Sequence, residues 1–241
     1  MIQKQELAFP FLFAIYLYKS IKLSYYACAA ELGGLMCRRF TVRSKPETVA
    51  KQFDAKLVDK FASEAIFSPQ DFVPIVVESR KNSERELRSA RFGIIPSFAM
   101  DPSVGKKMYN ARSETVDMKP SFRPAFEARR CIIPATGFFE WHLHNKEPHI
   151  VKPAKGKLFA FAGLWDRWRD PINDDVIVSC CIVTTDAAGP LSEIHQRMPA
   201  ILDKAAQDAW LNAKSQPEDL KTLLKPTTEV EIEYSDEVMA A

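Results

Sequence analysis

The sequence has few of the residues that build metal centres or disulfide frameworks. Its 241 residues include only five cysteines and four histidines. The number of cysteines is odd and none of their spacings is that of a metal site, so we expect a reducing compartment, no disulfide framework and one candidate reactive thiol. His142, His144 and His149 lie close together in sequence. No carboxylate or cysteine joins them at a fitting spacing, so neither a metal nor any other cofactor is expected.

Long apolar runs are also missing. Residues 7–18 are almost uninterrupted apolar sequence between lysines, but this run is shorter than the roughly 20 residues that span a bilayer. Residues 1–35 are therefore predicted to be an N-terminal extension, either a leader or a misassigned start ahead of Met36. An export signal with a cleavage region at 27–30 is the alternative. The mature form is expected to have no membrane contact.

Neither sign of charge dominates. The formal net charge is +2 at pH 7, which by itself says nothing about a nucleic-acid partner. The distribution is more informative, because acidic residues gather in the last stretch, at 229–237, and basic residues gather in the central part. This pattern is compatible with a phosphate-bearing partner, although an ordinary solvated surface would also give it. The basic residues are Arg38, Arg39, Arg43, Lys45, Arg80, Lys81, Arg85, Arg88, Arg91, Lys106, Lys107, Arg112, Arg123, Arg129 and Arg130.

The hydrophobic pattern predicts one α+β domain over residues 36–241. With 46% hydrophobic residues, the chain can bury a large core. Helices are expected at 46–60, where Pro46 suits the first turn, and at 203–211, where Asp203 is the capping candidate. Antiparallel strands are predicted to dominate, in a barrel-like sheet or a sandwich with a few flanking helices and an acidic C-terminal strand. Strands are expected at 73–78, 86–92, 130–133, 137–142, 149–152, 158–164, 176–184 and 229–234.

Several polar groups occur at unusual positions in this pattern. Glu140 lies in an aromatic strand, where burying an unpaired charge would be costly. Such a carboxylate often has a raised pKa and can act as general acid or base, whereas on a solvent face it would be an ordinary surface residue. His195 follows a Gly-Pro turn, and histidine is the usual proton carrier near neutral pH. Residues 110–114 combine an amide, a guanidinium and a carboxylate, which indicates either a site or a loop salt bridge.

Five motifs follow one another between residues 36 and 212. They are Met36–Phe40, Phe92–Phe98, Asn110–Glu114, Arg130–Trp141 and His195–Pro199. Each motif is weak by itself, but in this order they resemble the SRAP (SOS-response-associated peptidase) family of abasic site processing proteins. The resemblance implies a β-rich α+β fold with a positively charged groove for single-stranded DNA.

The resemblance also implies roles for particular residues. Cys37 would be the nucleophile that crosslinks to DNA, with Glu140 and His195 as an acid–base pair. Asn110 would hold the opened sugar of the lesion. Contacts with DNA are implied for Arg39, Phe92, Phe98, Arg112, Trp141 and Arg197. Two positions depart from the family's pattern: Arg38 stands where a glycine follows the nucleophile, so that it either crowds the site or adds a phosphate contact, and Ile66 stands where an asparagine is expected.

The implied chemistry needs a free amine on Cys37. An N-terminal cysteine offers an α-amine, with a pKa of about 8, and a thiol that can close a thiazolidine ring on the aldehyde of an abasic sugar. Initiation at Met36 followed by removal of the methionine would free this amine, and so would self-cleavage before Cys37. The sequence thus predicts a monomeric, cytoplasmic and nucleoid-associated DNA-repair protein of the SOS response. It is expected to have lyase-like and autopeptidase activity and to act on single-stranded DNA with abasic sites, with replication-fork proteins as further partners.

Three alternatives stay open on the sequence. The first is a thiol hydrolase or autoprotease in which Cys37 is the nucleophile and His195 and Glu140 assist it. The second is a relic that binds single-stranded DNA in a salt-dependent way without bonding to it. The third is an exported protein of unrelated role.

Overall fold

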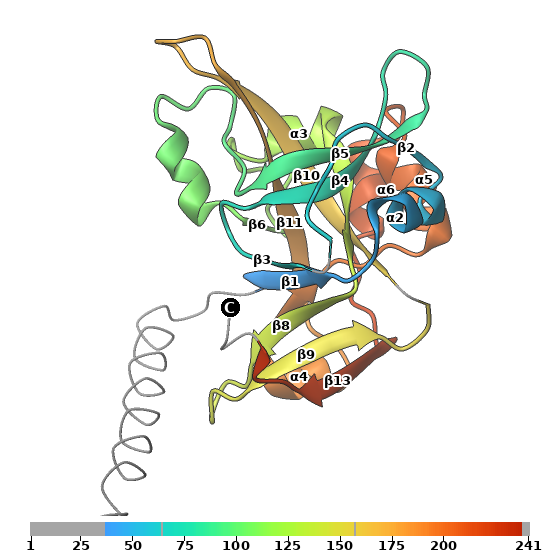
Figure 1. The fold of residues 1–241 in the computed structure, drawn as a ribbon. Coiled ribbons are helices and arrows are strands. Elements are labelled where there is room, and N and C mark those ends of the chain that lie inside the picture. The colour runs from blue at the N-terminus through green and yellow to red at the C-terminus, as the bar shows by residue number, and fades with distance from the viewer. Residues whose placement is uncertain (1–36, 64, 157, 238–241) are drawn as a thin grey trace, which may run out of the picture. The chain divides into compact units, whose positions relative to one another are not determined.

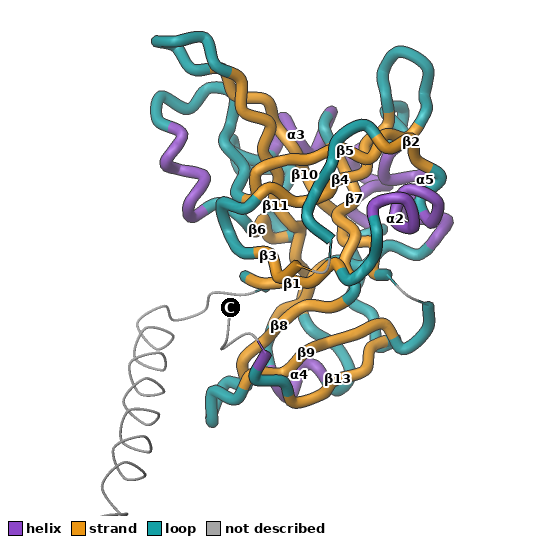
Figure 2. Tube along the Cα trace, viewed as in Figure 1, coloured by secondary structure: helices purple, strands orange, loops and turns teal. Residues whose placement is uncertain are grey.

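Strands make up most of the structure, a computed structural model that describes residues 37–63, 65–156 and 158–237 (Figure 1). The helices are short and lie around the strands (Figure 2). The strands form two sheets, and most neighbouring strands run antiparallel. This confirms the predicted α+β domain dominated by antiparallel strands.

The larger sheet has the strand order β12-β11-β10-β7-β4-β5-β2. Strand β11 also pairs in parallel with β5, where Cys180 lies opposite Phe92, so five strands close into a barrel-like ring. Closure removes the open edges of these strands. The strands of this sheet are β2 (Ala55–Leu57), β4 (Phe72–Glu78), β5 (Arg85–Phe92), β7 (Arg130–Ala135), β10 (Phe159–Arg169), β11 (Val176–Asp186) and β12 (Arg197–Pro199), and β6 (Asn110–Arg112) joins β11.

The smaller sheet is antiparallel throughout, in the order β13-β9-β8-β1-β3. Only Thr136 separates β7 of the larger sheet from β8 of the smaller one. Its backbone N–H donates to the carbonyl of Thr41 at 2.7 Å, which fixes β1 beside this corner. The strands are β1 (Arg39–Val42), β3 (Ala65–Phe67), β8 (Gly137–Trp141), β9 (Pro148–Pro153) and β13 (Val230–Tyr234), the last being the predicted acidic strand.

Aromatic rings join the two sheets. Phe40 of β1 lies 5.5 Å from Phe92 of β5 and 6.2 Å from Phe161 of β10, measured between ring centroids. Phe138 of β8 lies 5.8 Å from Phe161 as well. All four side chains are fully buried. Since large aromatic side chains contribute much of a core's buried area, this cluster fixes β1 and β8 against the barrel.

The helices differ in part from the sequence prediction. Helix α5 (Lys204–Leu211) begins where expected, and the carboxylate of Asp203 accepts a hydrogen bond from the backbone of Ala206 at 2.8 Å, as an N-cap does. The helix predicted at 46–60 is wrong in length, because α2 (Pro46–Gln52) ends early. Asp54 has a φ of 52°, which interrupts the helix before β2. The other helices are η1 (Pro102–Lys107), α3 (Arg123–Ala128), α4 (Leu191–Ile194) and α6 (Pro217–Thr222).

Arg130 fastens the helices α3 and α5 to the barrel. Its side chain is buried, and its guanidinium donates to four backbone carbonyls at 2.7 to 2.8 Å. The acceptors are Phe126, Glu127, Trp210 and Asn212. Burial lowers the pKa of this guanidinium from its usual value, but four charge-assisted hydrogen bonds compensate the buried charge.

The predicted N-terminal extension, residues 1–35, lies outside the described residues. Among the residues described, no helix combines the length and the apolar character needed to cross a bilayer.

Candidate functional site

Cys37 and Glu140 meet at the start of β1. The pairing of β1 with β8 places Arg39 opposite Phe139, so Cys37, two residues before β1, lies beside the end of β8. One carboxylate oxygen of Glu140, Oε1, accepts a hydrogen bond from the backbone N–H of Cys37 at 2.7 Å and from its thiol at 2.9 Å. Both residues are 1% exposed. Cys37 has a φ of 43°, a left-handed conformation that is unfavourable for a residue with a Cβ.

Burial determines the electrostatics of this pair. It raises the pKa of the Cys37 thiol well above its usual value, and the charge of Glu140 and its hydrogen bond raise it further, while the Arg197 charge opposes them. Burial also raises the pKa of Glu140, against the charge of His195 and the two hydrogen bonds from Cys37. The thiol is thus held neutral beside a carboxyl that is disposed to keep a proton. Such a carboxyl is suited to general acid–base work.

His195 sits directly behind the short helix α4. Its backbone N–H donates to Leu191 at 2.9 Å, which ends the helix, and its ring Nδ1 accepts from the backbone N–H of Arg197 at 3.1 Å. With Nδ1 accepting, a neutral ring carries its proton on Nε2. The residue is 9% exposed, and its charge acts on Glu140.

The end of β11 brings two distant motifs together. β6 pairs with one side of β11, where Asn110 lies opposite Ile182 and Arg112 opposite Thr184. β12 pairs with the same part of β11, with Arg197 opposite Asp186. The 110–114 and 195–199 motifs therefore flank the same end of β11. Glu114 and Arg197, which are in contact, lie 83 residues apart in the sequence.

Arg197 is held in place by two carboxylates and a carbonyl. Its guanidinium donates to Glu114 at 2.5 and 3.0 Å, to Asp186 at 2.5 Å and to the carbonyl of Thr184 at 2.8 Å. The salt-bridge interpretation of the 110–114 motif is therefore correct for Glu114, but its partner is Arg197 rather than its sequence neighbour Arg112, which is exposed.

The predicted DNA-contacting residues differ in accessibility. Phe98 is 60% exposed in the loop after β5, while Arg39 and Trp141 are partly buried. Phe92 is fully buried between Phe40 and Tyr109, so its prediction as a DNA contact needs correction: the ring belongs to the core and supports the site from inside. The position of Phe92 within its sequence motif did not show which face of β5 carries the ring.

Two features were missed by the sequence analysis. Tyr109 lies close enough to Glu140 for the carboxylate charge to raise the pKa of its hydroxyl, after the larger effect of burial. Its position directly before Asn110 was the available signal. The pairing of Arg197 with Glu114 and Asp186 had no sequence signal. As for a metal, the part of the chain that the structure describes places no group of three His, Cys, Asp or Glu residues so that it could hold one.

Comparison with known proteins gives a consistent family assignment. The family model described as SOS response associated peptidase (SRAP) matches residues 36–239. The abasic site processing protein YoqW of Bacillus subtilis (strain 168) is 38% identical over 202 residues, which cover 79% of this chain and 87% of the relative. The abasic site processing protein HMCES of Xenopus tropicalis is 31% identical over 199 residues, which cover 70% of this chain and 59% of that protein. A crystal structure of a protein from Bacteroides thetaiotaomicron matches with a TM-score of 0.78 and 27% identity, covering 85% of this chain and 95% of the other. The chain described here belongs to the SRAP family.

Proposed function

We propose that this protein captures abasic sites in single-stranded DNA by a covalent bond to Cys37, in a form in which Cys37 is the N-terminal residue. The observation that carries the proposal is the contact of one carboxylate oxygen of Glu140 with both the nitrogen and the sulfur of Cys37, at 2.7 and 2.9 Å. These are the two atoms that close a thiazolidine ring. The names of the SRAP relatives, abasic site processing proteins, agree with this substrate.

The chemistry balances without a cofactor. The amine of Cys37 adds to the aldehyde carbon of the ring-opened sugar, and the carbinolamine loses its hydroxyl as water after protonation, which leaves an imine. The thiol then adds to the imine carbon, and its proton passes to the ring nitrogen. Glu140 is the group within reach of both reacting atoms, so it donates the proton to the leaving hydroxyl and accepts the thiol proton. Ring closure is intramolecular and therefore fast.

The surrounding residues position the DNA. Asn110 binds the hydroxyl of the opened sugar, and His195 moves protons during imine formation and its reversal. Arg39, Arg112 and Arg197 bind phosphates, which fixes the backbone without reading sequence. Phe98 and Trp141 stack on bases next to the lesion. Such a protein acts as a monomer in the cytoplasm, at the nucleoid, where it shields lesions during the SOS response and meets replication-fork proteins.

The N-terminal extension has to be absent from the active form. While Cys37 is in a peptide bond, its nitrogen is an amide and cannot form an imine. We therefore assign residues 36–241 to the functional domain, and initiation at Met36 or self-cleavage before Cys37 to its maturation. Self-cleavage would be the autopeptidase activity, and elimination of the DNA strand at the captured sugar would be the lyase activity.

A thiol hydrolase acting on other chains is less well supported. Such enzymes need a thiolate, and cysteines that serve this purpose have lowered pKa values. Burial and the neighbouring carboxylate raise the pKa of the Cys37 thiol instead.

The test uses protein that begins at Cys37 and, in parallel, the full chain. Each is mixed with single-stranded DNA that carries one abasic site and is analysed on a denaturing gel and by intact mass. The controls are undamaged DNA, DNA with a tetrahydrofuran analogue that has no aldehyde, and the Cys37→Ala variant. A matched control is Cys131→Ala, because this thiol is also buried but lies in β7.

A heat-stable product with the summed mass of protein and DNA less one water, from the Cys37-start form only, is the expected result. Capture by the Cys37→Ala variant would contradict the assignment of the nucleophile. Reversible binding without any covalent product would establish the relic interpretation instead.

A further inference from the structure

The mouth of the barrel holds a cavity that the chemistry at Cys37 does not use. Its volume is about 760 Å³, and β4, β5, β10 and β11 each contribute side chains to its wall. A closed ring of strands is convex on its outside. A cavity that is lined by four of the five strands of the ring therefore opens into the inside of the ring.

This mouth lies at the other end of the barrel from Cys37. Arg129, which lines the cavity, directly precedes β7, and Thr136, which holds β1 beside β8, directly follows it. The six residues of β7 correspond to about 20 Å of strand. Figure 1 shows the hairpins that join β4 to β5 and β10 to β11 reaching upward, whereas β8 and β9 lie at the bottom. The cavity is therefore distinct from the Cys37–Glu140 site.

The walls of the cavity are apolar. Ile75 of β4, Trp165 of β10 and Val178 of β11 line it, and the last two are only partly buried within this chain. The hairpin that joins β10 to β11 adds apolar surface beside it, because Val176 is 39% exposed and Ile172 is 94% exposed. Apolar surface of this kind, when polar residues surround it, is typical of a protein-binding site.

The rim of the cavity carries an excess of positive charge. Two of its cations are paired with acidic neighbours, Arg88 with Glu86 at 2.6 Å and Arg129 with Asp166 at 3.1 Å. The side chain of Arg167 is exposed and has no hydrogen-bond or ion-pair partner within the described ranges, and the same holds for Lys81. The charged residues that line the cavity are Arg80, Lys81, Arg88, Arg129 and Arg167, against Glu78, Glu86 and Asp166.

We propose that the barrel mouth binds an acidic peptide segment of another protein, one that also carries an aromatic or branched apolar side chain. The apolar side chain enters between Ile75 and Trp165, and the neighbouring carboxylates pair with Lys81 and Arg167. This occupant matches both the apolar wall and the positive rim, and complementary charge also speeds the encounter. Single-stranded DNA matches the wall less well, because it binds through rows of aromatic rings, and Trp165 is the one aromatic residue among the described residues of the wall. The proposal does not depend on the capture of abasic sites.

The test begins with a display library of short random peptides, selected against the full chain. Enriched peptides are synthesised with a fluorescent label, and their affinity is measured by anisotropy at several salt concentrations. The variants are Lys81→Glu, Arg167→Glu and Val176→Asp. The matched controls are Arg123→Glu and Val104→Asp, because neither residue lines the cavity and Val104 is 38% exposed, almost as much as Val176. Urea denaturation verifies that every variant is folded.

The enriched peptides are expected to carry acidic residues next to an aromatic or branched apolar residue. Lys81→Glu, Arg167→Glu and Val176→Asp should each weaken their binding about tenfold or more, since each places a negative charge against an acidic ligand. Replacement of the apolar residue of the peptide by serine should weaken binding by a similar factor. Added salt should weaken it too, whereas the two controls should change it less than about twofold.

Several outcomes would overturn the proposal. They are that no peptide is enriched, that the enriched peptides are basic or lack an apolar residue, or that the variants of the rim stay within about twofold of the unaltered chain. Oligothymidine that displaces the peptide, and that loses affinity with Arg167→Glu, would assign the mouth to nucleic acid instead. Failure of the chain to crosslink abasic DNA would refute the proposed function and leave the peptide measurements as they stand.

Discussion

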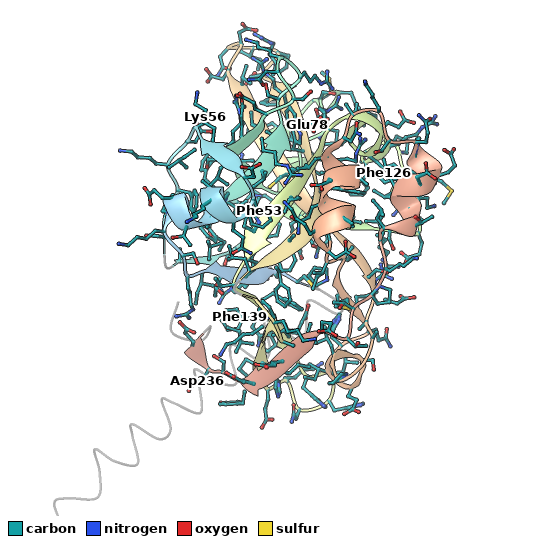
Figure 3. All side chains as sticks on the ribbon, turned by 90° about the vertical axis from the view of Figure 1, so that its right-hand side faces the viewer. Phe53, Lys56, Glu78, Phe126, Phe139 and Asp236 are labelled. Carbon is teal, nitrogen blue, oxygen red and sulfur yellow. The ribbon has the colours of Figure 1, made fainter. Side chains whose placement is uncertain are left out.

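Arg130 and Glu140 are both buried ionisable residues on consecutive strands, but their surroundings differ. Arg130 donates to four backbone carbonyls, which belong to α3 and to the end of α5. Glu140 accepts the two hydrogen bonds described for it from a single residue, Cys37. Figure 3 shows the two regions well apart: Phe126, whose carbonyl accepts a hydrogen bond from Arg130, is labelled in the upper half, and Phe139, the neighbour of Glu140, in the lower half.

The difference indicates that Arg130 stabilises the fold, whereas Glu140 is placed to take part in chemistry. A buried charge that is fully bonded to the backbone holds elements together, and its removal leaves several buried groups without partners. A buried ionisable group whose partner is a candidate nucleophile has a shifted pKa, and with a single partner residue it connects fewer elements. The following predictions test this distinction, beginning with the largest effect.

Arg130→Met is expected to lower the free energy of unfolding by about 3–5 kcal/mol, because four carbonyls lose their donor inside the protein. Urea denaturation measures this loss. The control is Arg167→Met, since Arg167 lies on β10 and is exposed. A loss below about 1 kcal/mol for Arg130→Met would show that the carbonyls find other donors, and the comparison would fail.

Glu140→Gln is expected to reduce the rate of crosslinking about 100-fold or more, because the amide cannot transfer the protons of the reaction. Its free energy of unfolding should change by less than about 1 kcal/mol, since an isosteric neutral group replaces a buried acid. Single-turnover gel kinetics and urea denaturation measure the two effects. Glu147→Gln is the control, on the exposed connection between β8 and β9. An unchanged rate would exclude Glu140 from the chemistry.

The stability difference between Glu140→Gln and the unaltered protein should depend on pH. Burial raises the pKa of Glu140 in the folded state. A carboxyl of this kind contributes stability below its unfolded pKa, and the contribution is lost as the pH rises through the folded pKa. The variant should therefore gain stability relative to the unaltered protein as the pH rises from about 4, the usual pKa of a glutamate, through the raised pKa of the folded state. Denaturation series at several pH values test this, and a difference that stays flat or reverses would argue against a raised pKa.

Asp186→Asn should have the smallest effect. Its partner Arg197 is only partly buried, and it lies between Arg130 and Glu140 in the number of structural contacts that it makes. The carboxylate of Asp186 is 80% exposed, and Arg197 keeps its bonds to Glu114 and to the carbonyl of Thr184. We expect a change in the free energy of unfolding of less than about 1 kcal/mol, as for other exposed ion pairs. Affinity for single-stranded DNA should rise slightly, because one competing anion is removed from Arg197. A fall in affinity would contradict the assignment of Arg197 to phosphate binding.

The sequence predicted the long strands and most of the candidate site, for different reasons. Strands of five or more residues carry an alternating or continuous apolar pattern, and all of those expected are present. The short strands β1, β3, β6 and β12 have three or four residues, too few for a period. They form because longer or neighbouring strands offer edges to them: β8 to β1, β1 to β3, and β11 to β6 and β12. The helix at 46–60 was predicted too long because its apolar spacing continues into β2.

The site was predicted as a set of motifs but not as a geometry. Cys37, Asn110, Glu140 and His195 were each suggested by sequence. The shared oxygen contact of Cys37 and the burial of Phe92 depend on which strands pair and in which register. The carboxylate partners of Arg197 come from two separate segments. Such long-range contacts leave no local signal in a single sequence.

The left-handed backbone at Cys37 has a consequence for maturation. The torsion φ exists only while an acyl group is attached to the nitrogen of the residue. In the full chain, the value of 43° costs on the order of 1 kcal/mol in the backbone conformation of Cys37. A chain that starts at Cys37 has no such torsion and no such strain. Cleavage ahead of Cys37 would therefore remove this conformational cost and free the amine that the capture of an aldehyde requires.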